Sequence, residues 1–343
     1  MPKRFLGNIM TAAPTAPDGP YQDSAASGVW SLAEALSYTK GGLWPTTGNA
    51  TPRALFAGGS APDGVNTIDY VNPASLGNAS DFGDLTVAAY GPAGTASKTR
   101  GVFAGGVSDN TFINTIGYVT ISSTGDAEDF GDLTFTRQNF GAGASDVRAV
   151  FNGGQGAGST YSNAIDYITI ASTGNATDFG DSTDDRNQST GFSSTTRAVF
   201  GGGKISGQPT NLIDFVTIDT AGNASDFGDL AEARRLLTGL SSPTRGVFAG
   251  GYVSARVNTI DYITIGSAGN ATDFGNLLAV NYGLAGASSH TVGLFGGGND
   301  ANLTDVINKI IIATTGNATD FGDLTVPRSL LAGASNSHGG LAA

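Results

Sequence analysis

Three neighbouring stretches decide the fold: Arg245-Gly-Val-Phe-Ala-Gly-Gly251, Asn258-Thr-Ile-Asp-Tyr-Ile-Thr-Ile265 and Gly269-Asn-Ala-Thr-Asp-Phe-Gly-Asn276. The first is an apolar run that ends in a glycine pair. The second alternates polar residues with β-branched and aromatic ones, which indicates a half-buried strand. We therefore predict short antiparallel strands joined by glycine-containing turns, with no helix in this unit.

The same unit occurs six times along the chain. Phe-x-Gly-Gly recurs every 47 to 49 residues, at Phe56, Phe103, Phe151, Phe200, Phe248 and Phe295. Asp-Phe-Gly-Asp/Asn has the same period and starts at Asp81, Asp129, Asp178, Asp226, Asp273 and Asp320. Two independent markers with one period indicate repeats, which begin near residues 53, 100, 148, 197, 245 and 293.

Each repeat contains four strand-like runs. The first run begins near an arginine, as in Arg137 to Ser145. A Gly-Asn dipeptide separates the third run from the fourth and favours a tight hairpin between them, with positive φ at both positions. Four strands in about 48 residues are typical of a propeller blade. We predict an all-β, six-bladed β-propeller over residues 53–335, and we expect the phenylalanine before each glycine pair to lie between blades. The glycine pairs that end the second strands are Gly58, Gly59, Gly105, Gly106, Gly153, Gly154, Gly202, Gly203, Gly250, Gly251, Gly297 and Gly298.

The strand order also predicts how the ring closes. The first repeat starts at Arg53 with a second-type strand, and a spare first-type strand, Arg328-Ser-Leu-Leu-Ala-Gly-Ala-Ser335, follows the sixth repeat. We expect this C-terminal segment to enter blade 1 as its missing strand. Residues 336–343 form a C-terminal tail that looks like a decayed second strand, with His338 at the repeated arginine position.

Composition excludes several classes of protein. The 343 residues include 52 glycines, no cysteine and two histidines, and the formal net charge is −12. A disulfide scaffold and a thiolate metal site are excluded, and an acidic chain argues against nucleic-acid binding. No apolar stretch approaches the ~18 residues that a membrane helix needs, so no membrane insertion is expected. The sequence indicates no cofactor.

Residues 1–52 lie outside the repeats and hold both tryptophans. Residues 11–29 are rich in Ala, Pro, Gly and Ser and are predicted to be extended. Ser31 and Glu34 form a capping box, which predicts a short helix over 32–38. A segment this small cannot bury a core of its own, so we expect an anchoring arm held by a partner through Phe5, Leu6, Trp30, Leu32, Leu36 and Trp44.

The repeats resemble the Kelch family of β-propellers. In that family the second strand ends in Gly-Gly, the third carries Tyr and the fourth carries Trp. The third-strand aromatics here are Tyr70, Tyr118, Tyr167, Phe215 and Tyr262, with Lys309 in repeat six. Every Trp is replaced by a phenylalanine: Phe82, Phe130, Phe179, Phe227, Phe274 or Phe321.

The arm and the repeats also resemble structural proteins of marine tailed phages, notably cyanophages. In the arm the similar strings are Ser27-Gly-Val-Trp-Ser-Leu-Ala-Glu34 and Gly42-Leu-Trp-Pro45; in the repeats they are Asn-Thr-Ile-Asp-Tyr and Gly-Asn-Ala-Thr-Asp-Phe-Gly-Asp. This resemblance implies a non-enzymatic virion component: a tail fibre, a tail or baseplate appendage, or a head decoration. Its implied partners are other virion proteins, copies of itself in a symmetric particle, and a host-surface glycan or receptor.

Several motifs have a sharper functional interpretation that we set aside. The Asn-Ala-Ser/Thr triplets at Asn78, Asn175, Asn223, Asn270 and Asn317 match a glycosylation pattern, but each occupies the same turn, and the first nine residues lack the apolar core of a signal peptide. The Asp-Phe-Gly triplet matches the magnesium-binding motif of protein kinases, but it occurs here without a phosphate loop or a catalytic-loop motif. The paired aspartates of Asp-Phe-Gly-Asp, such as Asp81 and Asp84, lack the ligand density of a calcium loop. We expect these aspartates to form hydrogen bonds within turns and to form ion pairs with Arg100, Arg148, Arg197 and Arg245.

Two alternatives to the virion interpretation stay open. A propeller enzyme acting on glycans would gather non-repeated carboxylates at one mouth of the ring, but Asp184, Asp185 and Glu232 form no recognisable pair, and His290 and His338 lie in turns. A Kelch-like interaction module outside any virion is the other alternative. Under every interpretation, the loops after the glycine pairs differ in length and are expected to share one face, where a ligand would bind.

Overall fold

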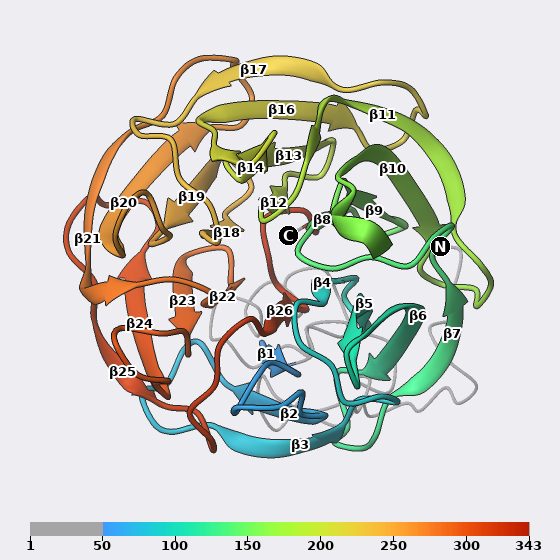
Figure 1. The fold of residues 1–343 in the computed structure, drawn as a ribbon. Coiled ribbons are helices and arrows are strands. Elements are labelled where there is room, and N and C mark those ends of the chain that lie inside the picture. The colour runs from blue at the N-terminus through green and yellow to red at the C-terminus, as the bar shows by residue number, and fades with distance from the viewer. Residues whose placement is uncertain (1–50, 343) are drawn as a thin grey trace, which may run out of the picture. The chain divides into compact units, whose positions relative to one another are not determined.

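The structure is a computed structural model that describes residues 51–342, and the arm residues Phe5, Leu6, Trp30, Leu32, Leu36 and Trp44, with the expected helix over 32–38, lie outside them. Residues 51–342 form six four-stranded antiparallel sheets, the blades, around a central axis (Figure 1). The predicted all-β, six-bladed propeller is therefore confirmed.

The strands of each blade run in order from the axis outward. Blade 1 contains β26 (Ala332–Ser335), β1 (Ala54–Ala57), β2 (Thr67–Val71) and β3 (Ser80–Asp84). Blade 2 contains β4 (Ala93–Ala96), β5 (Arg100–Ser108), β6 (Thr111–Thr120) and β7 (Glu128–Asp132). Blade 3 contains β8 (Gly141–Ala144), β9 (Arg148–Asn152), β10 (Ser162–Thr169) and β11 (Thr177–Arg186).

The remaining blades repeat this order. Blade 4 contains β12 (Thr190–Ser193), β13 (Arg197–Gly201), β16 (Leu212–Thr217) and β17 (Ser225–Asp229). Blade 5 contains β18 (Thr238–Ser241), β19 (Arg245–Ala249), β20 (Val257–Thr264) and β21 (Thr272–Asn281). Blade 6 contains β22 (Ala285–Ser288), β23 (Val292–Gly296), β24 (Val306–Ile311) and β25 (Thr319–Asp323). Loops of blades 3 and 4 add the 3₁₀ turn η1 (Ala157–Ser159), β14 (Lys204–Ile205) and β15 (Gln208–Pro209).

The ring closes through the C-terminal strand, as the strand order predicts. β26 pairs antiparallel with β1, with Leu55 opposite Ala334 and Ala57 opposite Ala332. One sheet therefore joins the two ends of the propeller, so blade 1 is complete only when both are present.

The glycine pairs end the second strands in a left-handed backbone. Gly58 and Gly59 have φ of 63° and 107°, and a Cβ on either would approach a backbone oxygen to 2.8 Å. The phenylalanine before each pair packs between blades, as expected. Phe56 of blade 1, for example, packs with Leu294 and Ile307 of blade 6.

The Gly-Asn dipeptides do not form the tight hairpins that the sequence predicts. Third and fourth strands are joined by longer loops, in which the glycine has positive φ and the asparagine does not. Instead, the asparagine side chain accepts a hydrogen bond from the fourth strand of the preceding blade. In one example the N–H of Asp181 donates to Asn223 Oδ1 at 3.1 Å. The Asp-Phe-Gly-Asp motif lies in that fourth strand, as the sequence predicts, so the two motifs together join neighbouring blades around the outer circumference.

The arginine pairing predicted from the sequence is wrong. The carboxylates of the fourth-strand motifs do not pair with Arg100, Arg148, Arg197 and Arg245 among the described ion pairs. Each of these arginines instead stacks on the third-strand ring of its own blade and donates to a carbonyl of the next blade. Arg148, for example, lies 4.4 Å from the Tyr167 ring centroid and donates from Nη1 to Ile218 O at 2.9 Å.

A different set of arginines forms the buried ion pairs. Each lies just before a first strand and pairs with the aspartate of the third strand in the same blade: Arg137 with Asp166, Arg186 with Asp214, Arg234 with Asp261, and Arg328 with Asp69. All eight side chains are almost fully buried. Desolvation lowers the pKa of Arg137 to about 10, because burial disfavours the charged form.

Candidate functional site

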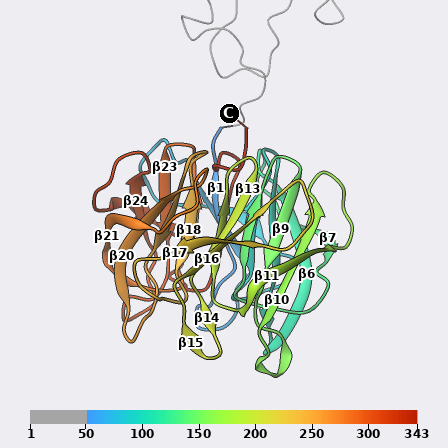
Figure 2. The ribbon, with the colours of Figure 1, turned by 90° about the horizontal axis from the view of Figure 1, so that it is seen from above.

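The propeller has two unlike faces. The loop face carries the segments after the glycine pairs, where Ser60, Val107, Gln155, Lys204, Tyr252 and Asn299 each form a bridge to the connection that enters a first strand. The opposite face, the terminal face, carries the first and last described residues, and the N–H of Arg53 donates to Asn336 Oδ1. Figure 2 shows β14 and β15 at the end of the disc away from the C-terminal label. The variable loops therefore share one face, as expected, and the described chain begins and ends at the other.

A closed circle of backbone hydrogen bonds surrounds the axis at the loop face. Six residues with φ between 54° and 71°, one from each blade, take part: Gly91, Asn139, Gln188, Leu236, Gly283 and Leu330. The N–H of each donates to the carbonyl of the preceding one at 2.7 to 3.0 Å, and Gly91 donates to Leu330. A left-handed non-glycine residue costs on the order of 1 kcal/mol. The hydrogen bonds of the circle offset this cost at its four non-glycine positions and fix the opening of the axial channel.

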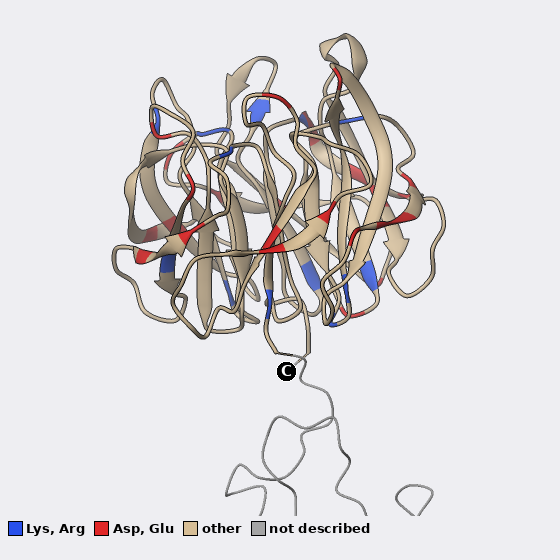
Figure 3. Ribbon diagram, turned by 90° about the horizontal axis from the view of Figure 1, so that it is seen from below, with Lys and Arg blue, Asp and Glu red and all other residues tan. Residues whose placement is uncertain are grey.

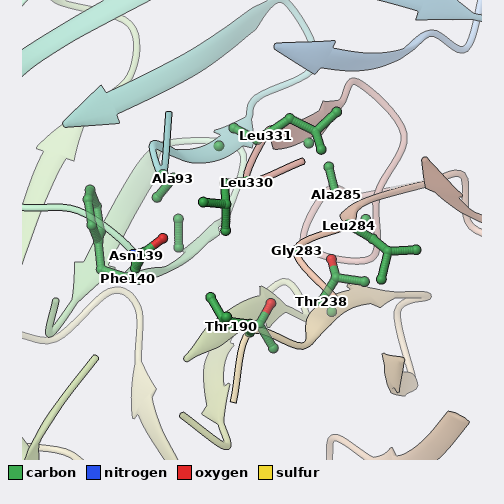
Figure 4. A pocket seen from close by; sticks show the side chains of 18 of the residues that line it. Ala93, Asn139, Phe140, Thr190, Thr238, Gly283, Leu284, Ala285, Leu330 and Leu331 are labelled. Carbon is green, nitrogen blue, oxygen red and sulfur yellow. The ribbon is translucent and has the colours of Figure 1, made fainter. Parts of the chain in front are cut away.

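The axial channel below this circle is narrow. Its wider part has a volume of about 100 Å³ and is lined by small and apolar residues, among them Thr190, Thr238, Leu330 and Leu331 (Figure 4). Ligand pockets usually exceed ~300 Å³, and no carboxylate of residues 51–342 lines this space. The channel is therefore too small for a saccharide and lacks the paired acids of a glycosidase.

The C-terminal tail closes the channel at the terminal face. His338 Nε2 donates to Ala96 O of blade 2 at 2.8 Å, and the N–H of Gly339 donates to Ser241 O of blade 5 at 3.1 Å. Leu341 is buried, and the N–H of Ala342 donates to Asp146 Oδ2 near blade 3. A second space of about 40 Å³, lined in part by His338, lies above the tail. The tail therefore ties three blades together across the axis.

His338 makes the tail sensitive to acid. The N–H of Gly340 donates to its Nδ1 while Nε2 donates to Ala96 O, so the imidazole must be neutral. Burial, with a smaller contribution from His290, lowers its pKa to about 4, although the hydrogen bond to Ala96 O and the nearby Asp146 carboxylate act in the opposite direction. Because the unfolded state binds the proton first, stability should be complete above about pH 6.5 and fall as the pH drops toward 4. The loss should reach ~3 kcal/mol.

Denaturant unfolding of the full chain between pH 4 and pH 7 measures this loss. His338→Gln should flatten the profile over that range, and His290→Gln, the matched control, should leave it steep. Equal slopes for His338→Gln and the unmodified chain would show that His338 does not couple to folding.

The loop face is hollowed between blades 3 and 4. An open groove of about 460 Å³ is lined by Tyr161, Asp184 and Asp185 from blade 3, and by Ile205 and Ser206 from blade 4. Two of the three non-repeated acids noted in the sequence thus lie on one groove wall. Within residues 51–342, no cluster of three or more His, Cys, Asp or Glu side chains is arranged to hold a metal ion.

A second feature of the loop face lies on blades 5 and 6. Arg235, Tyr252, Arg256, Tyr282 and Asn299 form contiguous contacts there, and we name them the rim cluster. Sequence reasoning missed these residues, since the combination does not repeat and the five are spread over positions 235 to 299. The available signal was the presence of two arginines and two tyrosines in these segments of two neighbouring repeats.

Comparison with known proteins adds no assignment, because neither a family model nor a curated protein matches this chain. In the part of the chain that the structure describes, no helix has the length and apolar character needed to span a membrane.

Proposed function

We propose that this protein is a non-enzymatic component of a tailed-phage virion, anchored through residues 1–52 and displaying the loop face to a ligand. It would serve as a tail fibre, a tail or baseplate appendage, or a head decoration. The observation that carries the proposal is that the two faces of the propeller differ. The described chain begins on the terminal face, where Arg53 lies beside Asn336, while the segments that vary in length lie on the opposite face.

The closed construction of the disc supports a display role. The backbone circle, the β26–β1 pairing and the tail hold the loops on a rigid frame, and rigid scaffolds with variable loops are how proteins present binding surfaces. The resemblance of the arm to phage structural proteins supports the virion assignment.

Particle incorporation tests this proposal. Mass spectrometry of gradient-purified particles from the encoding virus should detect the full chain, and a variant that lacks residues 1–50 should be absent from particles while staying soluble and folded. Incorporation of the truncated chain at the level of the full chain would contradict anchoring by the arm.

A further inference from the structure

The rim cluster is a continuous arrangement of two guanidinium groups and two phenol rings. Arg235 lies 5.0 Å from the Tyr252 ring centroid, the two tyrosine rings meet edge-on at 6.0 Å, and Arg256 lies 5.4 Å from the Tyr282 centroid. All four side chains are half-buried. The cluster adjoins the channel mouth, because Arg235 Nη1 donates to Gln188 Oε1 at 2.9 Å.

Both arginines are oriented by neutral acceptors. Arg256 Nη2 donates to Asn299 Oδ1 at 2.9 Å, as Arg235 does to Gln188. The five ion pairs within residues 51–342 involve neither arginine. A guanidinium has five N–H donors, so each of these groups retains donors and an uncompensated positive charge. The nearby Asp300 caps its own loop by accepting the N–H of Asn302.

The fold does not require charge or aromatic rings at these positions. The position of Arg235 is occupied in the other blades by Tyr90, Gln138, Asn187, Tyr282 and Ser329, and that of Tyr252 by Ser60, Val107, Gln155, Lys204 and Asn299. Each pair forms a backbone bridge, which any of these side chains permits. In blade 3 the two side chains are the amides of Gln138 and Gln155, and Asn187 of the next blade donates to Gln155 Oε1. The concentration of Arg and Tyr on blades 5 and 6 therefore indicates a ligand.

We propose that the rim cluster binds an acidic polysaccharide through its carboxylate or sulfate groups. Guanidinium groups bind planar or tetrahedral oxyanions with paired hydrogen bonds. Two cations separated by two aromatic rings fit acidic groups spaced along a polymer, which engages both at once and gains from multivalency. The net charge of −12 repels polyanions elsewhere on the surface and so makes this local attraction selective.

Charge-matched variants provide the test. Arg235→Gln with Arg256→Gln removes two positive charges from the rim cluster. Lys98→Gln with Lys309→Gln removes two from elsewhere, since Lys98 lies on the terminal face beside Asp146, and Lys309 is in β24. Titration calorimetry of the full chain would use an alginate oligomer as the carboxylate probe, dextran sulfate as the sulfate probe, dextran as the neutral control and single-stranded poly(dT) as the phosphate polymer.

The expected result is binding to one or both acidic probes that weakens with salt, at least tenfold weaker for the rim variant and within twofold for the control variant. The probe bound more tightly identifies carboxylate or sulfate as the recognised group. Failure to bind either acidic probe, equal losses in both variants, or equal affinity for poly(dT) would overturn the proposal. The inference rests on the proposed ligand-binding role of the loop face; particle incorporation of the chain is measured separately, so the two can fail independently.

Discussion

Deleting residues 328–343 is expected to abolish cooperative unfolding of the propeller. The deletion removes β26 and leaves β1 without its inner partner. It also leaves the Asp69 carboxylate buried without the Arg328 guanidinium. It also removes the tail contacts to blades 2, 3 and 5. Thermal melting followed by circular dichroism should show a broad transition or none.

A shorter deletion isolates the role of the strand. Removing residues 338–343 takes away the tail beyond Ser337 and keeps both β26 and Arg328. This variant should retain one cooperative transition at a lowered midpoint. An unchanged melting curve for the longer deletion would show that the ring does not depend on the β26–β1 pairing.

Breaking one buried ion pair should have the next largest effect. Arg137→Asn leaves the Asp166 carboxylate buried with only the hydroxyl and N–H of Thr134 as partners. Asp166→Asn leaves the Arg137 guanidinium buried without a counter-charge, next to backbone carbonyls and the rings of Phe135 and Phe140. Each change should lower the free energy of unfolding by about 3–5 kcal/mol, because an uncompensated charge stays in the interior. Denaturant titration measures this loss.

The double variant has a natural precedent in the same chain. Blade 6 carries Asn281 and Asn308 at these positions, where Asn281 Nδ2 donates to Gly297 O and Asn308 Oδ1 accepts the N–H of Leu278. Arg137→Asn with Asp166→Asn copies this arrangement, so it should recover at least half of the loss caused by either single change. Additive losses in the double variant would show that the two side chains are not coupled.

The periodic features of the fold were accessible from the sequence. The glycine pairs need positive φ and the third strands alternate, so both leave a signal in every repeat. The C-terminal strand was recognisable because Arg328 to Ser335 copies a first strand whose partner is missing near Arg53.

The partners of the arginines were not accessible, because sequence spacing does not tell whether an arginine faces a carboxylate or a carbonyl. Arg148 and Arg137 recur with the same period, yet the first bonds a carbonyl and the second bonds Asp166. The backbone circle was hidden because four of its six left-handed positions hold Asn, Gln or Leu rather than glycine. The rim cluster is not repeated, and only the fold brings Arg235 near Tyr282 through Tyr252.

The charged residues fit the division between the two faces. Figure 3 shows Lys and Arg positions at both ends of the disc. Arg100, Arg148, Arg197 and Arg245 act as clamps, because each donates to a carbonyl of the next blade. Arg235 and Arg256 are not part of those clamps, which is consistent with the ligand-binding role proposed above for the rim cluster.

Cysteine labelling in assembled particles tests the central claim most directly. The chain has no cysteine, so Ser206→Cys on the loop face and Val147→Cys on the terminal face each introduce one reactive thiol at an exposed position. Isolated variants should react with a maleimide at similar rates. In purified particles the account predicts that Ser206→Cys stays reactive and that Val147→Cys is at least fivefold slower. Fast labelling at position 147 with protection at 206, or absence of the chain from particles, would contradict it.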